Sequence, residues 1–221
     1  LGITPDDAGA LRVRLREALE AADVVLLSGG TSKGAGDVSD RVVSRLGDPG
    51  IVAHGVALKP GKPICLAATG GGGVVVLPGF PISGIFTFHE FVAPVVRLLA
   101  GRGAEERTTV PARLAVKVNS EIGRTEYLLV GLVDTAGGDG PNLAAYPMGQ
   151  GSGSVTTFSR ADGFATIGRH HEIVEAGTVV DVQLLGRVLQ LADLVVIGSH
   201  CIGLDALLGE LQRQGLRTKF L

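Results

Sequence analysis

Residues 23–37 read DVVLLSGGTSKGAGD, and this stretch decides how the first part of the chain folds. An apolar run is followed by a loop of small residues and then by a helical pattern over residues 38–46. Glycines let backbone N–H groups approach a phosphate closely, and a helix N-terminus adds a favourable dipole. The stretch predicts an anion-binding loop between a strand and a helix, although an ordinary turn of small residues would give the same pattern.

The composition indicates a folded chain without a nucleic-acid or membrane partner. The 221 residues carry a formal net charge of −2, and 45% of them are hydrophobic, which suffices for one large domain or two small ones. Lys and Arg form no basic stripe. We find no apolar run near the length of a membrane span and no signal peptide. Cys65 and Cys201 lie far apart in apolar contexts, which favours a reduced, cytoplasmic protein.

Residues 1–104 have the pattern of an α/β domain. We expect strands at residues 23–27, 51–58, 64–68 and 74–77, and helices beginning at Pro5, Val38 and Ile82. Continuous apolar strands that alternate with helices predict a parallel sheet covered on both faces. Ligands of such sheets bind beyond the carboxyl ends of the strands, where both the glycine loop and the loop at residues 77–83 fall.

The pattern changes after residue 104. Residues 105–186 contain short, partly alternating strands between Gly, Asn and Asp turns, which predict a small β-barrel domain. Residues 187–221 contain a strand pattern and a helix pattern that are too short to bury their own faces. We expect this last part to be the start of a further α/β domain, or to dock on the rest of the chain. Because the chain begins with Leu1, we also expect it to be a piece of a longer protein.

Two further segments accompany the glycine loop. The turn KPGKP at residues 59–63 places the ammonium groups of Lys59 and Lys62 on a rigid backbone, which suits a dianionic ligand. A pair of surface lysines is the plainer interpretation. In PGFPIS at residues 78–83 the two prolines fix the backbone, and Ser83 either binds an anion or caps the following helix. Asp37 is either a Mg²⁺ ligand or the N-cap of the helix beginning at residue 38.

The order and spacing of residues 28–37, 59–63 and 77–83 resemble the molybdopterin molybdenumtransferase family. The resemblance continues at residues 145–147, 151–154 and 160–163, which are similar to the family's C-terminal β-domain. Residues 187–221 resemble the start of a substrate-binding-protein-like domain that some members carry. The resemblance thus implies a molybdopterin-binding α/β domain at residues 1–104 with its N-terminal part missing, a small β-barrel at 105–186 and a binding-protein-like start at 187–221.

The family's activity implies roles for individual residues. Members insert molybdenum from molybdate into adenylylated molybdopterin and release AMP with the help of Mg²⁺. The resemblance implies catalytic roles for Asp37, Lys59 and Lys62, with Asp37 also as the metal ligand. The implied cofactor contacts are Ser28, Gly29, Gly30, Thr31, Ser32, Gly34, Gly36, Pro78, Gly79, Pro81 and Ser83. Full-length members imply a homodimer and further N-terminal domains, so we expect this fragment to be inactive or weakly active alone.

Several alternatives remain open at the level of the sequence. Phe80 stands where many relatives have Asn, and its ring either stacks on a pterin or adenine ring or packs. This departure, with the extra C-terminal part, also permits a non-catalytic module that binds or senses molybdopterin or molybdate. Ser152, Ser154, Arg160 and Asp162 either approach the cofactor or form a β-turn with a structural Arg–Asp contact. We expect His89 to be structural within an apolar helix, and Cys65 to be a small buried hydrophobe.

Overall fold

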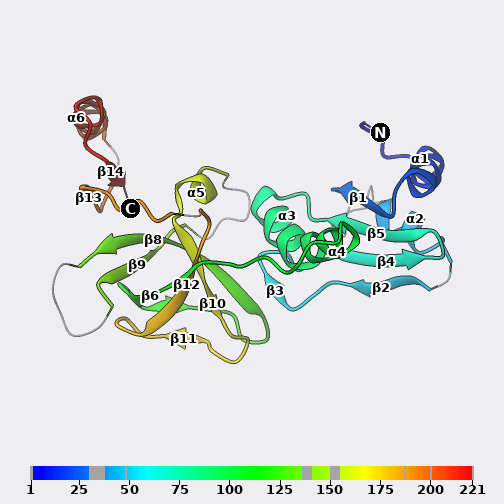
Figure 1. Cartoon of the computed structure of the whole chain (residues 1–221), viewed down its shortest axis with the longest axis horizontal. Coiled ribbons are helices and arrows are strands. Elements are labelled where there is room, and N and C mark those ends of the chain that lie inside the picture. The colour runs from blue at the N-terminus through cyan, green and yellow to red at the C-terminus, as the bar shows by residue number, and fades with distance from the viewer. Residues whose placement is uncertain are drawn as a thin grey trace. The chain divides into compact units, whose positions relative to one another are not determined.

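The computed structural model describes residues 2–29, 38–47, 49–135, 141–149, 155–186, 188–199 and 201–220. The chain divides into two compact units, one made mainly of residues 1–106 and the other mainly of residues 107–221. Each unit has its own sheet and its own core, and each is described by itself below (Figure 1).

The first unit is built around a four-stranded sheet with the order β1-β5-β4-β2. Its strands are β1 (Val24–Ser28), β2 (Gly50–His54), β4 (Cys65–Thr69) and β5 (Gly72–Leu77). The two-residue strand β3 (Leu58–Lys59) follows β2 along the chain and is not part of this sheet. The helices of the first unit are α1 (Ala8–Ala21), α2 (Ser39–Val43), α3 (Pro81–Thr87), the π-helical turn η1 (Phe88–Val92) and α4 (Ala93–Leu99).

The predicted α/β class with a covered sheet is confirmed, and the sheet itself is mixed. Strands β1 and β5 are parallel, whereas β4 runs antiparallel to both β5 and β2. The reason is the length of the connections, because a parallel pair needs a crossover of a dozen or more residues. Only Gly70 and Gly71 separate β4 from β5, so these strands form a hairpin. The parallel pair is the one that positions the site.

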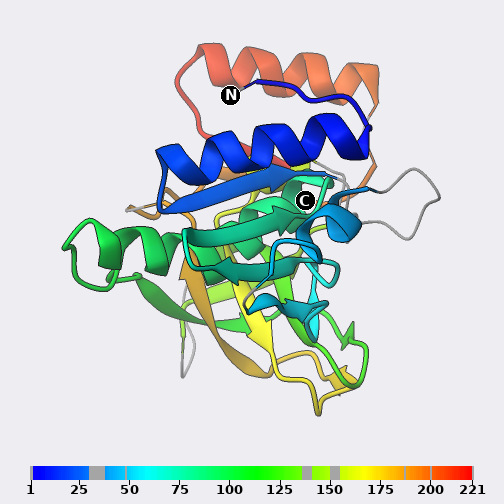
Figure 2. The same ribbon diagram turned by 90° about the vertical axis from the view of Figure 1, so that its right-hand side faces the viewer.

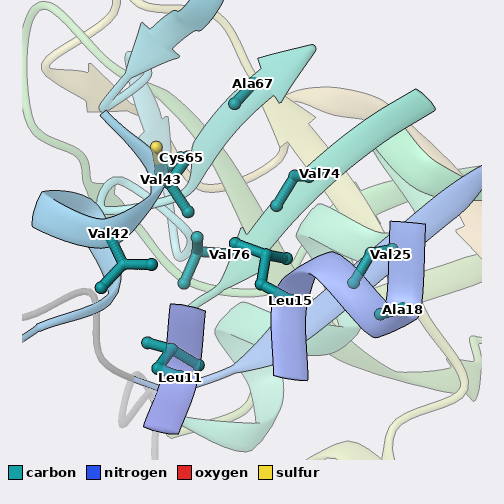
Figure 3. Close-up of a cluster of buried hydrophobic side chains, with 10 residues drawn as sticks. All are labelled: Leu11, Leu15, Ala18, Val25, Val42, Val43, Cys65, Ala67, Val74 and Val76. Atoms are coloured by element: carbon teal, nitrogen blue, oxygen red, sulfur yellow. The ribbon is translucent and has the colours of Figure 1, made fainter. Parts of the chain in front are cut away.

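Helix α1 covers one face of the sheet beside β1 (Figure 2). Leu11, Leu15 and Ala18 of α1 pack on Val74 and Val76 of β5 in one buried cluster (Figure 3). The intervening side chain of β5, Val75, points to the opposite face and packs with Ile64 and Val92. Successive side chains of a strand point to opposite faces, so the unbroken apolar sequence of β5 buries the sheet on both sides.

Helices α3, η1 and α4 form one continuous helical stretch, Pro81–Leu99. By length and composition alone it is apolar enough to cross a membrane, so the expectation that no apolar stretch reaches such a length fails on this criterion. The stretch also serves the core of its own unit, because Ile82, Phe86 and Val92 are each at most 4% exposed. A core helix passes the same test, so length and composition do not assign it to a membrane.

The second unit contains a closed five-stranded barrel. Its strands β6 (Thr109–Leu114), β8 (Thr125–Asp134), β9 (Leu143–Pro147), β10 (Gly163–Ile167) and β12 (Val179–Leu184) pair in the order β10-β12-β6-β9-β8, and β8 pairs again with β10. A short ribbon of β7 (Val118–Asn119) and β11 (Ile173–Val174) and the helix α5 (Val155–Arg160) complete this part. The small β-barrel predicted from the sequence is thereby confirmed.

The C-terminal residues form a β-α-β element. Strand β13 (Leu194–Val196) and strand β14 (Thr218–Phe220) are parallel neighbours joined by helix α6 (Ile202–Arg213). Of the described residues of α6, only Leu208 is buried, and Ile202 is 90% exposed. The element has the connectivity expected for the start of an α/β domain, and that assignment remains a prediction.

Candidate functional site

The carboxyl ends of β1 and β5 lie next to each other because the two strands are parallel. Ser28, the last residue of β1, is in register with Leu77, the last residue of β5. Gly29 continues the contact beyond the strands, since its N–H donates to the carbonyl oxygen of Leu77 at 3.1 Å. The glycine loop, which begins at Gly29, and the loop at residues 77–83, called the proline loop below, therefore leave the sheet at the same end of the two parallel strands, as the sequence predicts.

The two loops touch without intervening side chains. A Cβ atom at Gly79 would lie 3.6 Å from the Cα atom of Gly29, and a Cβ at Gly84 would lie 3.2 Å from the carbonyl oxygen of Pro78. The first distance is an ordinary van der Waals contact, so the two loops would also accommodate an alanine at residue 79. The second distance is tighter, and it separates α3 from the proline loop rather than one loop from the other.

A pocket of about 370 Å³ opens beside this junction, and we call it the elbow pocket. Its described wall consists of Ser28, Leu77, Pro78, Gly79, Pro81, Gly84, Ile85, Phe88 and His89. Ser28, Pro78, Gly79 and Pro81 are four of the residues predicted to contact the cofactor. The wall is mostly apolar, and Ser28 and His89 supply its polar side chains among the described residues. A mainly apolar pocket with few polar groups is typical of a small-molecule site.

The KPGKP turn at residues 59–63, called the lysine turn below, packs against α3, the helix that follows the proline loop. Gly61 is buried and has a left-handed φ of +119°, and a Cβ there would lie 2.5 Å from Cγ2 of Thr87 and 3.7 Å from the carbonyl oxygen of Ser83. The turn is anchored further because Val56 N–H donates to the carbonyl oxygen of Lys62 at 2.9 Å. Lys62 is exposed and Lys59 is half-buried. The structure thus places the lysine turn against α3, at Ser83 and Thr87.

Ser83 is not the N-cap of α3. The N-cap is Phe80, no side chain caps the helix, and Ser83 lies in its first turn with 4% of its surface exposed. Its carbonyl oxygen accepts a hydrogen bond from Thr87 Oγ1 at 2.7 Å. Phe80 itself is 63% exposed, so the interpretation that its ring packs into the core is wrong. An exposed aromatic ring next to an apolar pocket is available to a ligand.

His89 is a wall residue of the elbow pocket. It was expected to be structural, but it is exposed and lines the elbow pocket. It lies eight residues after Pro81 on the face that also carries Gly84, Ile85 and Phe88, as i, i+3, i+4, i+7 and i+8 spacing places them. Its ring meets Phe88 edge-on, with centroids 5.5 Å apart. That helical spacing was the signal from which His89 could have been found.

Some predicted residues lie outside the described part of the chain. These are Gly30, Thr31, Ser32, Gly34, Gly36 and Asp37, with Ser152 and Ser154 of the second unit. The N-cap position of α2 belongs to Val38. Within the described ranges, no three His, Cys, Asp or Glu side chains cluster closely enough to hold a metal.

Asp162 has a structural role in the second unit. Its Oδ2 accepts the N–H of Leu132 at 2.5 Å and also pairs with the ammonium group of Lys219. Its own N–H donates to the carbonyl oxygen of Val130 at 3.0 Å, and its carbonyl oxygen accepts the N–H of Leu185. The partners differ from the expected arginine contact, since they are backbone groups of the barrel and a lysine of β14.

Comparison with known proteins assigns both units. Residues 1–98 match the model of the probable molybdopterin binding domain, and residues 111–185 match the model of the MoeA C-terminal region, domain IV. The chain belongs to the molybdopterin molybdenumtransferase family. The family resemblance seen in the sequence is confirmed, and so are the two fold types that it implied.

Individual relatives agree with this membership. Molybdopterin molybdenumtransferase 1 of Mycobacterium tuberculosis is 30% identical over 193 residues, which are 85% of this chain and 44% of that protein. Molybdopterin molybdenumtransferase of a Nostoc species is 38% identical over 131 residues, 58% of this chain and 30% of that protein. The crystal structure of the molybdopterin biosynthesis MoeA protein of Pyrococcus horikoshii has a TM-score of 0.65 at 34% identity, covering 83% of this chain and 42% of that one. The chain therefore spans less than half the length of these relatives.

Proposed function

We propose that this chain binds adenylylated molybdopterin at the elbow pocket and takes part in inserting molybdenum from molybdate. In this reaction the two dithiolene sulfurs of molybdopterin acquire the metal, and hydrolysis of the phosphoanhydride bond releases AMP. The proposal rests on membership of a family whose named relatives are molybdenumtransferases. Because those names describe enzymes, they favour a transferase over a sensing module.

The observation that carries the proposal is the junction of the two loops. The hydrogen bond from Gly29 to Leu77 joins the start of the glycine loop to the proline loop at the mouth of a 370 Å³ pocket. This geometry supports a ligand whose phosphates meet the backbone N–H groups of the glycine loop, while a ring packs on the apolar wall. Pro78 and Pro81 lack N–H donors and fix the backbone around the ligand.

In this proposal the chain binds the two reactants, orients them and neutralises their negative charge. Lys59 and Lys62 neutralise the phosphates and the incoming molybdate, which lowers the repulsion between two anions. Holding both reactants in one pocket converts their encounter into an intramolecular step. Mg²⁺, held by Asp37, would supply a further positive charge at the phosphoanhydride. The same resemblance underlies our proposals that the full-length protein is a cytoplasmic homodimer.

Calorimetric titration with adenylylated molybdopterin tests the proposal. We expect Lys59→Ala and Lys62→Ala to weaken binding at least tenfold, because each removes one charge-assisted contact. Lys117→Ala is the matched control, since this lysine is half-exposed in the second unit and lies 3.7 Å from Glu175. No binding by the folded chain would reject the proposal. Equal losses in all three variants would reject a role for the lysine turn, whose two lysines are not among the described wall residues of the elbow pocket. Release of AMP on adding molybdate separates the transferase from a module that only binds.

A further inference from the structure

A second pocket of the first unit is surrounded by arginines. It has a volume of about 190 Å³, and Arg12 and Arg16 of α1 and Arg45, which follows α2, all line it. Leu19, Val42 and Thr69 are among the other wall residues. We call this the arginine pocket. Arg12 and Arg16 are four residues apart, so they lie on one face of α1.

The arginine pocket is separate from the elbow pocket. Thr69 ends β4 and is in register with Gly72, the first residue of β5. The elbow pocket lies at the other end of β5, where Leu77 is in register with Ser28. The two pockets therefore lie toward opposite ends of β5, and a ligand of one does not occupy the other.

The three guanidinium groups of the arginine pocket form no ion pairs within the described part of the chain. None of Arg12, Arg16 and Arg45 has an ion pair with a described residue, and no described wall residue is acidic. Arg14, one position away on α1, contrasts with them because its Nη1 lies 3.0 Å from Glu17 Oε2. Like charges that converge on one pocket repel each other, and a bound anion removes that repulsion.

We propose that the arginine pocket binds a small tetrahedral oxyanion, either free or as the phosphate group of a larger molecule. Guanidinium groups form paired, charge-assisted hydrogen bonds to such oxygens. A volume of 190 Å³ is below the roughly 300–1,000 Å³ of pockets for whole drug-sized ligands. The pocket therefore has room for a single oxyanion group. This inference is independent of the function proposed for the elbow pocket.

Thermal unfolding of the full chain in phosphate tests the inference, because a ligand of the folded state raises the midpoint in a concentration-dependent way. Inorganic phosphate is titrated against sodium chloride of equal ionic strength, with circular dichroism as the readout. We expect phosphate to raise the midpoint beyond chloride, and Arg16→Gln and Arg45→Gln to weaken its apparent affinity at least tenfold. Arg14→Gln is the matched control, since Arg14 is on the same helix but is not among the described wall residues and is paired with Glu17.

Two further arms locate the anion and identify its source. If Lys62→Ala abolishes the phosphate effect while Arg16→Gln and Arg45→Gln do not, the anion binds near the lysine turn and the inference is wrong. Equal effects of phosphate and chloride also overturn it. Molybdate and AMP, titrated in the same way, show whether a free oxyanion or a phosphate monoester binds more tightly. Failure of all three anions to stabilise the protein would exclude the site.

Discussion

Gly61 and Thr87 are packed so closely that residue 61 has no room for a side chain. A Cβ at Gly61 would lie 2.5 Å from Cγ2 of Thr87. Thr87 cannot turn away easily, because it is fully buried and its Oγ1 donates to the carbonyl oxygen of Ser83 at 2.7 Å. This contact joins the lysine turn to the helix that carries the wall of the elbow pocket.

We therefore predict that Gly61→Ala lowers the free energy of unfolding by about 1–3 kcal/mol, the range for a forced overpacked contact. It should also weaken ligand binding, since the lysine turn must move. Gly123→Ala is the control, because Gly123 has a φ of +90° but nothing within 4 Å of its added Cβ. Equal losses of stability in urea titrations of the two variants would show that backbone strain, and not the contact with Thr87, limits residue 61.

The sequence predicted the architecture well where the apolar pattern is continuous. The strand expected at residues 74–77 lies within β5, and the parallel neighbours β1 and β5 bring the two predicted loops to one edge. These predictions succeed because a strand buried on both faces must be apolar at every position. The arrangement of the loops then follows from parallel pairing alone.

Other predictions failed where a local turn or cap competes with the pattern. The single strand expected at residues 51–58 is broken at Gly55, which has a φ of +87° and donates its N–H to the carbonyl oxygen of Ile64. The first helix begins at Ala8 and not at Pro5, because Asp7 caps it by accepting the N–H of Ala10 at 2.7 Å. Asp is a strong N-cap residue, whereas the prediction placed Pro5 in the first position of the helix.

His89 gives a test of the elbow pocket that the sequence did not suggest. We predict that His89→Phe weakens binding of adenylylated molybdopterin several-fold, because it removes a polar group of the wall while keeping a ring. His54→Phe is the comparison, since His54 is exposed on β2 and is not a described wall residue. Calorimetry that finds the same affinity for His89→Phe and the wild type would remove His89 from the site.

The two cysteines should differ in reactivity. Burial and the nearby charge of Asp40 raise the pKa of Cys65 above its ordinary value of 9.0, and its side chain is buried in the core of the first unit. Cys201 is exposed. Because the thiolate is the reactive form, we predict that an aromatic disulfide reagent titrates one thiol at pH 8 in the native state and two in denaturant. Cys201→Ser should abolish the native reaction, and persistent reaction in that variant would contradict the burial of Cys65.

The pKa of the Cys65 thiol also sets the sign of a pH effect on stability. Around pH 9.0 the thiol ionises more readily in the unfolded chain than in the folded one, where its pKa is raised. The unfolded state then binds fewer protons, so stability falls as the pH rises through this range. We predict that Cys65→Ala, compared with the wild type by urea unfolding between pH 8 and pH 10, loses less stability over that interval. An identical pH dependence in the two proteins would contradict the pKa shift.

An ion pair between Asp193 and Arg217 lies at the start of the C-terminal β-α-β element. Hydrogen bonds from the Arg217 side chain and backbone, at 2.8–3.2 Å, lower the pKa of Asp193 to about 2. The pair therefore persists at neutral pH and is lost only as the pH falls through about 2. We predict that Arg217→Gln shifts the Asp193 carboxyl titration, followed by NMR, back toward 3.8. A titration midpoint that the variant leaves unchanged would exclude Arg217 as the cause.

We predict that Asp162 stabilises the second unit through two contacts, one with the N–H of Leu132 and one with Lys219. Mutation can separate the two. Asp162→Ala removes the acceptor of the Leu132 N–H and the partner of Lys219, whereas Lys219→Met removes only the ion pair. A backbone donor left without a partner lowers stability by about 1–3 kcal/mol, so Asp162→Ala should be the more destabilising change. Hydrogen exchange should then show loss of protection at Leu132 in Asp162→Ala and retained protection there in Lys219→Met. If instead Asp162→Ala leaves stability unchanged and weakens binding of adenylylated molybdopterin, Asp162 acts on the ligand and not on the barrel.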